Sequence, residues 1–220
     1  MTKRYVLFDL DGTLLDINMN EFLKSYFEKL IPFLKRWIKG DVYKIVMTST
    51  DYMINEINGD LNQKKFLYKF SLLSGLSEDR VNEIFQNFYK TEFPKLNILG
   101  RPVPKAREIL LRIHNEGYTL VLATNSLFPL IAVKERMKWA KIEDIPFSLI
   151  TTAENMHYAK PYKEYYLEIL DFFNANPKEA IMIGDDFELD ISPAKSIGID
   201  AYRIGEDIES LEEIFDILKR

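Results

Sequence analysis

Apolar residues follow two different spacings along the chain, and these spacings divide it into two parts. Short apolar runs rich in β-branched and aromatic residues occur before residue 10 and again after residue 117, as is typical of buried strands. Segments with helical spacing alternate with these runs. The expected strands are Tyr5–Phe8, Tyr118–Ala123, Phe147–Ile150, Ala180–Ile183 and Ala201–Ile204. The expected helices of this part are residues 102–114, Pro129–Trp139, Tyr162–Phe173, Ile191–Ser196 and Leu211–Lys219.

Residues 17–95 show helical spacing throughout, with no strand signal. The expected helices are Asn20–Lys39, Asp41–Ile57, Leu61–Leu73 and one that starts after Ser77 and ends near Pro94. Pro32 predicts a kink or split in the first helix, and Gly40 its C-cap. Asp60 is expected to cap the third helix at its N-terminus. The aromatic side chains of this segment are expected to pack in its core rather than to contact a ligand; they are Phe66, Phe70, Phe85, Phe88 and Tyr89.

The alternation of strands and helices predicts an α/β fold with a doubly wound parallel sheet. The strand Tyr5–Phe8 must join that sheet, because a single strand cannot stand beside four helices. The helical segment is therefore an insertion after the first strand. We expect an α/β core domain of residues 1–16 and 96–220, with an inserted all-helical domain of residues 17–95.

Composition narrows the classes of function. The chain has 220 residues, no cysteine and a formal net charge of −5. The absence of cysteine excludes thiol nucleophiles and fits a cytoplasmic location. The negative charge, with no basic stretch, argues against nucleic acid and anionic membranes as partners. No apolar run approaches the ~18 residues of a membrane span, so no membrane partner is expected. The sequence sets no oligomeric state.

Polar residues follow four of the expected strands. They are Asp9 and Asp11, then Thr124, Asn125 and Ser126, then Lys160, then Asp185, Asp186 and Asp190. Ligands of doubly wound sheets bind outside the carboxyl ends of the strands, where these residues should meet. Each has another reading: the acids and Thr124 could cap helices or form turns, and Lys160 could be a surface charge.

Asp9 and Asp11 stand directly after a buried apolar run. Two carboxylates that lie so close together repel each other, and the pKa of each is raised unless a positive group lies between them. The pair therefore predicts a divalent cation.

Four short segments resemble the signatures of the haloacid dehalogenase-like (HAD) hydrolases and occur in that family's order. They are FDLDGTLLD from residue 8, VLATNS from residue 121, AKP from residue 159 and GDDFELD from residue 184. The insertion after the first signature resembles the phosphoglycolate phosphatase-like subgroup, which carries a helical C1 cap domain. One departure is Lys163, where many relatives have a proline.

The resemblance implies roles for these residues. Asp9 would be the nucleophile and Asp11 the general acid and base. Mg²⁺ would be held by Asp9, Asp185 and the backbone carbonyl of Asp11. Substrate binding would fall to Thr124, Asn125 and Lys160, whose groups donate to phosphate oxygens. Asp186 and Asp190 stay open, since either could reach the metal through water or hold the lysine.

The function implied is a Mg²⁺-dependent phosphatase that acts on a small phosphorylated metabolite through an aspartyl-phosphate. A phosphomutase or another phosphotransferase of the same family remains an alternative, as does a non-catalytic HAD-like binding protein. Asp11 and the later acids argue against a dehalogenase, and no cap lysine for a phosphonatase can be placed. A signalling receiver module is disfavoured because its lysine comes last, whereas Lys160 precedes Asp185.

Overall fold

Five parallel strands form the central sheet in the computed structural model, which describes residues 3–219. The sheet order is β5–β4–β1–β6–β7. The strands are β1 Tyr5–Phe8, β4 Thr119–Leu122, β5 Leu149–Ile150, β6 Ala180–Gly184 and β7 Asp200–Arg203. Each was expected, within one or two residues at its ends, and the α/β fold class is confirmed. The central position of β1 places whatever follows Phe8 in the middle of one sheet edge.

Helices cover both faces of the sheet, because successive residues of its buried strands point to opposite sides. The helices of this part are α5 Ala106–Asn115, α6 Leu130–Trp139, α7 Lys163–Phe172, α8 Ser192–Ser196 and α9 Ile214–Leu218. Val6 and Phe8 join a core cluster with α5 and α6, whereas Leu7 joins a second cluster with α7 and α8. The chain is therefore doubly wound, as expected. None of the helices within residues 3–219 combines the length and apolarity of a membrane span.

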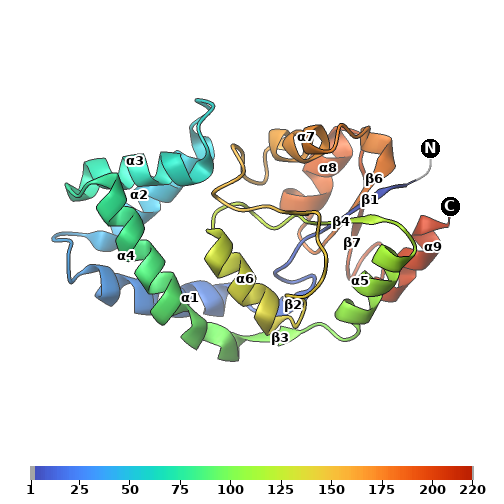
Figure 1. Ribbon diagram of the computed structural model, residues 1–220, viewed down its shortest axis with the longest axis horizontal. Coiled ribbons are helices and arrows are strands. Elements are labelled where there is room, and N and C mark those ends of the chain that lie inside the picture. Colours follow the sequence, from blue (N-terminus) through green and yellow to red (C-terminus); the bar gives the residue numbers. More distant parts are fainter. Residues whose placement is uncertain (1–2, 220) are drawn as a thin grey trace.

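Four helices gather at one end of the molecule, and we call this group the helical cap (Figure 1). They are α1 Met19–Leu34, α2 Val42–Asn55, α3 Asn62–Ser74 and α4 Glu78–Thr91. The side chain of Ser77 accepts a hydrogen bond from Arg80 N–H, so the expected cap of α4 is present.

The expected bounds of α1 were wrong. Pro32 does not split the helix, which continues through it as one element and ends at Leu34 rather than Lys39. Gly40, at φ +88°, lies in the connection before α2 and does not cap α1. Ile38 is nevertheless 4% exposed, so an apolar residue beyond the helix end continues the buried pattern that suggested a longer helix.

The start of α3 also differs from expectation. Leu61, which has no capping side chain, occupies the N-cap position, and Asp60 instead pairs with Lys64 at 2.6 Å. The free N–H groups of Asn62 and Gln63 donate to backbone carbonyls of the core, those of residues 156 and 153. Contacts with the core thus take the place of a side-chain cap.

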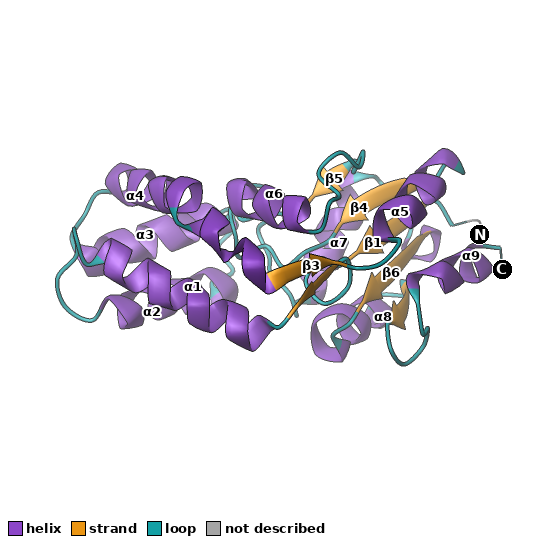
Figure 2. Cartoon of the chain, turned by 90° about the horizontal axis from the view of Figure 1, so that it is seen from below, coloured by secondary structure: helices purple, strands orange, loops and turns teal. Residues whose placement is uncertain are grey.

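A short antiparallel ribbon, which was not predicted from the sequence, joins the helical cap to the core. β2 Leu15–Ile17 pairs with β3 Gly100–Pro102, between the cap helices and the sheet (Figure 2). Pro102 therefore ends a strand, and α5 begins only at Ala106. The division at residues 16/17 and 95/96 stays a prediction; the first point falls within β2, the second within the 3-10 helix Phe93–Leu99.

Candidate active site

Asp9 lies at the end of β1, in the middle of the sheet edge formed by the carboxyl ends of the strands. Its N–H donates to the carbonyl of Ile183 on the neighbouring strand β6, at 2.9 Å. The side chain is also buried, so this backbone hydrogen bond and the packing around the side chain together hold the carboxylate in place. The chain then turns sharply, and Leu14 N–H bonds back to Leu10 O at 2.9 Å.

Gly12 allows this turn to approach the opposite acidic segment. Its φ is +89°, and a Cβ at this position would lie 2.2 Å from Oδ2 of Asp185. Only glycine combines the left-handed backbone with this close approach. The turn after β1 and the acid after β6 are therefore built to touch.

Lys160 is buried between two carboxylates. Its Nζ donates to Oδ1 of Asp9 at 2.7 Å and to Oδ1 of Asp190 at 2.5 Å. Asp190 sits in the π-helical turn Phe187–Ile191 after β6 and is also buried. The Oδ1 of Asn125 accepts a hydrogen bond from Lys160 N–H at 3.2 Å, which anchors the backbone of the lysine.

This arrangement separates the two acids that the sequence left open. Asp190 holds Lys160, and its Oδ2 also accepts from Asp186 N–H at 3.2 Å. Asp186 faces its own turn, where Oδ1 accepts from Glu188 N–H and Leu189 N–H. Asp186 is thus a cap of the π-helical turn.

Burial controls the ionisation of this cluster. It raises the pKa of Asp9 well above the ordinary value, although the nearby Lys160 ammonium opposes the rise. The pKa of Asp185 is raised by burial and by the Asp190 carboxylate. Burial disfavours the charged form of Lys160, but Asp190 and Asp9 outweigh it, and its pKa ends well above the ordinary value.

Three carboxylates at this edge have a geometry that suits a metal ion. One oxygen from each of Asp9, Asp185 and Asp190 lies within 4.8 Å of the others. Carboxylate oxygens are the ligands that Mg²⁺ prefers. The cluster contains three carboxylates and only one ammonium, that of Lys160, so it keeps an excess of negative charge. The residues present therefore fit a divalent cation. The expected ligands, Asp9, Asp185 and the backbone carbonyl of Asp11, stay a prediction, because this cluster concerns side-chain oxygens alone. Asp190, which the sequence left open, is the third carboxylate of the cluster.

The Asp11 carboxylate turns away from this cluster. Its Oδ2 accepts a hydrogen bond from Nη1 of Arg136 on α6, and the guanidinium also lies 4.6 Å from the centre of the Phe128 ring. Arg136 is only 1% exposed. Within the described residues, Asp11 Oδ1 and the Nε and Nη2 of Arg136 have no hydrogen-bond partner. Burial raises the pKa of Asp11, while Arg136 and Lys160 oppose the rise.

Sequence reasoning missed Arg136. Its signal lies in the helical spacing of α6, where Ala132, Val133 and Arg136 share the buried face with Met137. An arginine at a core position of a helix needs a partner, and Asp11 is that partner.

Thr124 and Ser126 follow β4 at the same sheet edge and are buried. The Thr124 carbonyl accepts hydrogen bonds from the Thr151 hydroxyl at 2.7 Å and the Tyr165 hydroxyl at 2.8 Å. The Ser126 hydroxyl donates to the carbonyl of Tyr158 at 2.7 Å. These bonds make the loop after β4 rigid, so its groups stand at fixed positions beside the acids.

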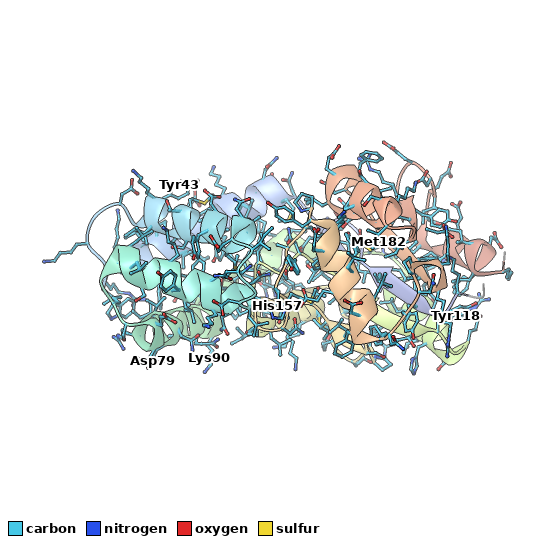
Figure 3. The ribbon with its side chains drawn as sticks, turned by 90° about the horizontal axis from the view of Figure 1, so that it is seen from above. Tyr43, Asp79, Lys90, Tyr118, His157 and Met182 are labelled. Carbon is cyan, nitrogen blue, oxygen red and sulfur yellow. The ribbon has the colours of Figure 1, made fainter. Side chains whose placement is uncertain are left out.

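His157, which was not among the candidate site residues, lies where the helical cap meets the core (Figure 3). Its Nδ1 is 2.6 Å from Oε1 of Glu168, and its carbonyl accepts a hydrogen bond from the buried Lys65 of α3. Both contacts are structural.

Comparison with known proteins agrees with this geometry. The family described as haloacid dehalogenase-like hydrolase matches residues 6–204. A glyceraldehyde 3-phosphate phosphatase of Pyrococcus furiosus is 33% identical over 113 residues, 51% of this chain. That alignment spans 44% of the relative's length. The pyrophosphatase PpaX of Bacillus cereus is 24% identical over 183 residues, 82% of this chain and 74% of the relative.

Solved structures share the fold over the whole length. The HAD-hydrolase YfnB of Bacillus subtilis, whose structure has bound magnesium, superimposes with a TM-score of 0.59. The match covers 100% of both chains at 18% sequence identity, so it shows a common fold.

Proposed function

The chain belongs to the haloacid dehalogenase-like hydrolases, and on this premise we propose that it is a Mg²⁺-dependent phosphatase acting on a small phosphorylated metabolite. The observation that carries the proposal is the position of Asp9. Its carboxylate stands at the centre of the sheet edge, bonded to Lys160 and close to Asp185 and Asp190. Relatives named for glyceraldehyde 3-phosphate and pyrophosphate support phosphate as the group transferred.

Asp9 acts as the nucleophile. Lys160 binds its Oδ1, which leaves the second oxygen to attack the phosphorus. A bond forms between that oxygen and phosphorus as the bond to the leaving alcohol oxygen breaks. The product of this step is an aspartyl-phosphate. Asp9, Asp185 and Asp190 would hold Mg²⁺, which lets an anionic carboxylate approach an anionic phosphate.

Asp11 moves the proton. In the first step it donates a proton to the leaving oxygen, which burial favours by raising the pKa of Asp11. In the second step the carboxylate takes a proton from the attacking water, and the bond between Asp9 and phosphorus breaks. The contact with Arg136 stabilises that charged form. In both steps Thr124 would donate a hydrogen bond to the phosphate oxygens, and Lys160 would offset their negative charge.

The test is release of inorganic phosphate from a generic aryl phosphate. We expect turnover with Mg²⁺, loss of turnover with EDTA and recovery when Mg²⁺ is added in excess. Asp9→Asn should lower turnover by about a thousandfold or more, since general catalysis by single groups is worth ~10²–10⁴. Asp16→Asn is the matched control, because Asp16 is an exposed acid of the same segment. Turnover that survives both EDTA and Asp9→Asn would refute the proposal.

A further inference from the structure

The helical cap and the loop before α6 enclose a cavity of about 330 Å³. All four cap helices contribute side chains to it, among them Tyr26, Val46, Phe85 and Tyr89. The core contributes Phe128 and, from the loop after β5, Ala153. Some of the aromatic residues that were expected to form the core of the helical cap therefore have a second role, because they also line this cavity.

The lining of this cavity is apolar and nearly uncharged. Among the described residues that line it there is no lysine, arginine or histidine, and Asp51, the one acid, is exposed. The hydroxyls of Tyr26 and Tyr89 hydrogen-bond to each other at 3.0 Å. Burial raises the pKa of Tyr26 to about 12 and also raises that of Tyr89, so both stay neutral. An anionic group placed here would lose its hydration without gaining a cation.

The Arg136 guanidinium and the Phe128 ring stand between the candidate general acid and the cavity. Phe128 lines it, and the guanidinium of Arg136 stands 4.6 Å from the centre of that ring while it holds the Asp11 carboxylate. The leaving oxygen of a substrate on Asp9 must reach Asp11 to receive its proton. A leaving group that extends from this point into the cavity must therefore pass beside the Phe128 ring.

We propose that this cavity binds the leaving group of the substrate, and that the preferred substrate is the monophosphate ester of an uncharged, apolar alcohol or phenol. The proposal rests on the phosphatase function proposed above. A cavity of about 150 Å³ is sufficient to bind benzene, so this one has room for a fused ring pair or a medium-length alkyl chain. Pyrophosphate and glyceraldehyde 3-phosphate, for which two relatives are named, offer no apolar group to fill it.

The first experiment is a series of n-alkyl phosphates from methyl to octyl, with pyrophosphate and glyceraldehyde 3-phosphate beside them. Burial of one methylene is worth about fourfold in binding, so kcat/KM should rise about fourfold per carbon until the cavity is full. Hexyl phosphate should exceed both polar compounds by at least about tenfold. A flat series, or a preference for either polar compound, would overturn the proposal.

A charge placed in the cavity gives a second test. Gln86 of α4 lines the cavity and is half-buried, whereas Asn87 beside it is exposed and lies outside the lining. Gln86→Lys should lower kcat/KM for octyl phosphate at least about tenfold and leave that for methyl phosphate within about twofold. Asn87→Lys is the matched control and should change neither. Equal losses on both esters in Gln86→Lys would contradict the assignment.

Binding of 1-hexanol to the Asp9→Asn variant, measured by calorimetry, separates this inference from the phosphatase proposal. If 1-hexanol binds and Gln86→Lys abolishes this binding, the cavity assignment is supported even when no ester is hydrolysed. The absence of hydrolysis would then refute only the phosphatase proposal. Hydrolysis without chain-length dependence, together with no binding of 1-hexanol, would leave the phosphatase standing and overturn the apolar leaving-group site.

Discussion

Removal of the Arg136 side-chain charge should destabilise the fold strongly. Arg136 and Asp11 form an ion pair whose side chains are only 2% and 13% exposed. Loss of one partner leaves an uncompensated buried charge, which typically lowers the free energy of unfolding by about 3–5 kcal/mol. Arg136→Met keeps an apolar side chain at this buried position and removes the guanidinium, which pairs with Asp11 and lies over the Phe128 ring.

The magnitude makes this effect easy to measure. A shift of 1 kcal/mol moves the Tm of a chain of this size by about 2–4 °C, so Arg136→Met should lower Tm by about 6–20 °C. Urea unfolding followed by circular dichroism gives the same difference as a free energy. The effect is large because a typical domain has only about 5–15 kcal/mol of stability.

Two variants test the reasoning. Arg112→Met removes an exposed arginine that pairs with Glu116 on the surface, and it should change stability by less than about 1 kcal/mol. The double variant Asp11→Asn/Arg136→Met should be more stable than Arg136→Met alone, because no unpaired carboxylate remains. The reasoning is refuted if Arg136→Met is as mild as Arg112→Met, or if the double variant is less stable than the single one.

Three other changes probe the site and the surface. Gly12→Ala should raise the Mg²⁺ concentration needed for half-maximal activity by about tenfold or more, because its Cβ would displace Asp185; an unchanged Mg²⁺ titration would contradict this. Lys160→Met should abolish turnover and lower Tm, because two buried carboxylates lose their shared cation; an active enzyme would exclude the role given to the lysine. The hydrogen bond from Lys3 holds the pKa of Asp200 low, so the pair contributes stability above about pH 4 that is lost as the pH falls. Since Asp200 is half-exposed, Asp200→Asn should lower the unfolding free energy by at most about 1 kcal/mol at pH 7 and by almost nothing at pH 3. An equal loss at both pH values would be inconsistent with this pair.

The sequence predicted the sheet well because β1, β4 and β6, which form its centre, are buried apolar runs. It missed β2 and β3 for the opposite reason. Each has three residues, among them Asp16, Arg101 and Pro102, and neither carries a pattern of its own. They become strands only by pairing with each other across the whole helical cap. Local spacing cannot report a pairing between segments so far apart in the chain.

The candidate site shows the same limit. Asp9, Lys160 and Asp185 were placed together because each follows a strand of one sheet edge, which chain order reveals. The difference between Asp186 and Asp190 depends on a π-helical turn of five residues, and helical spacing does not define such a turn. Arg136 depends on the packing of α6 against the turn after β1, so only tertiary structure shows its partner.

The hydrogen bonds at the start of α3 join the helical cap to the segment that carries Lys160. Lys65 Nζ donates to the carbonyl of His157 at 2.7 Å, and Asn62 Nδ2 donates to that of Tyr158 at 3.2 Å. Lys160 stands two residues further along the same segment. A motion that lifts the cap to let a product leave must break these bonds, each worth about 1 kcal/mol. We therefore expect that opening of the cap would release the segment that carries Lys160, and with it the charge cluster around Asp9.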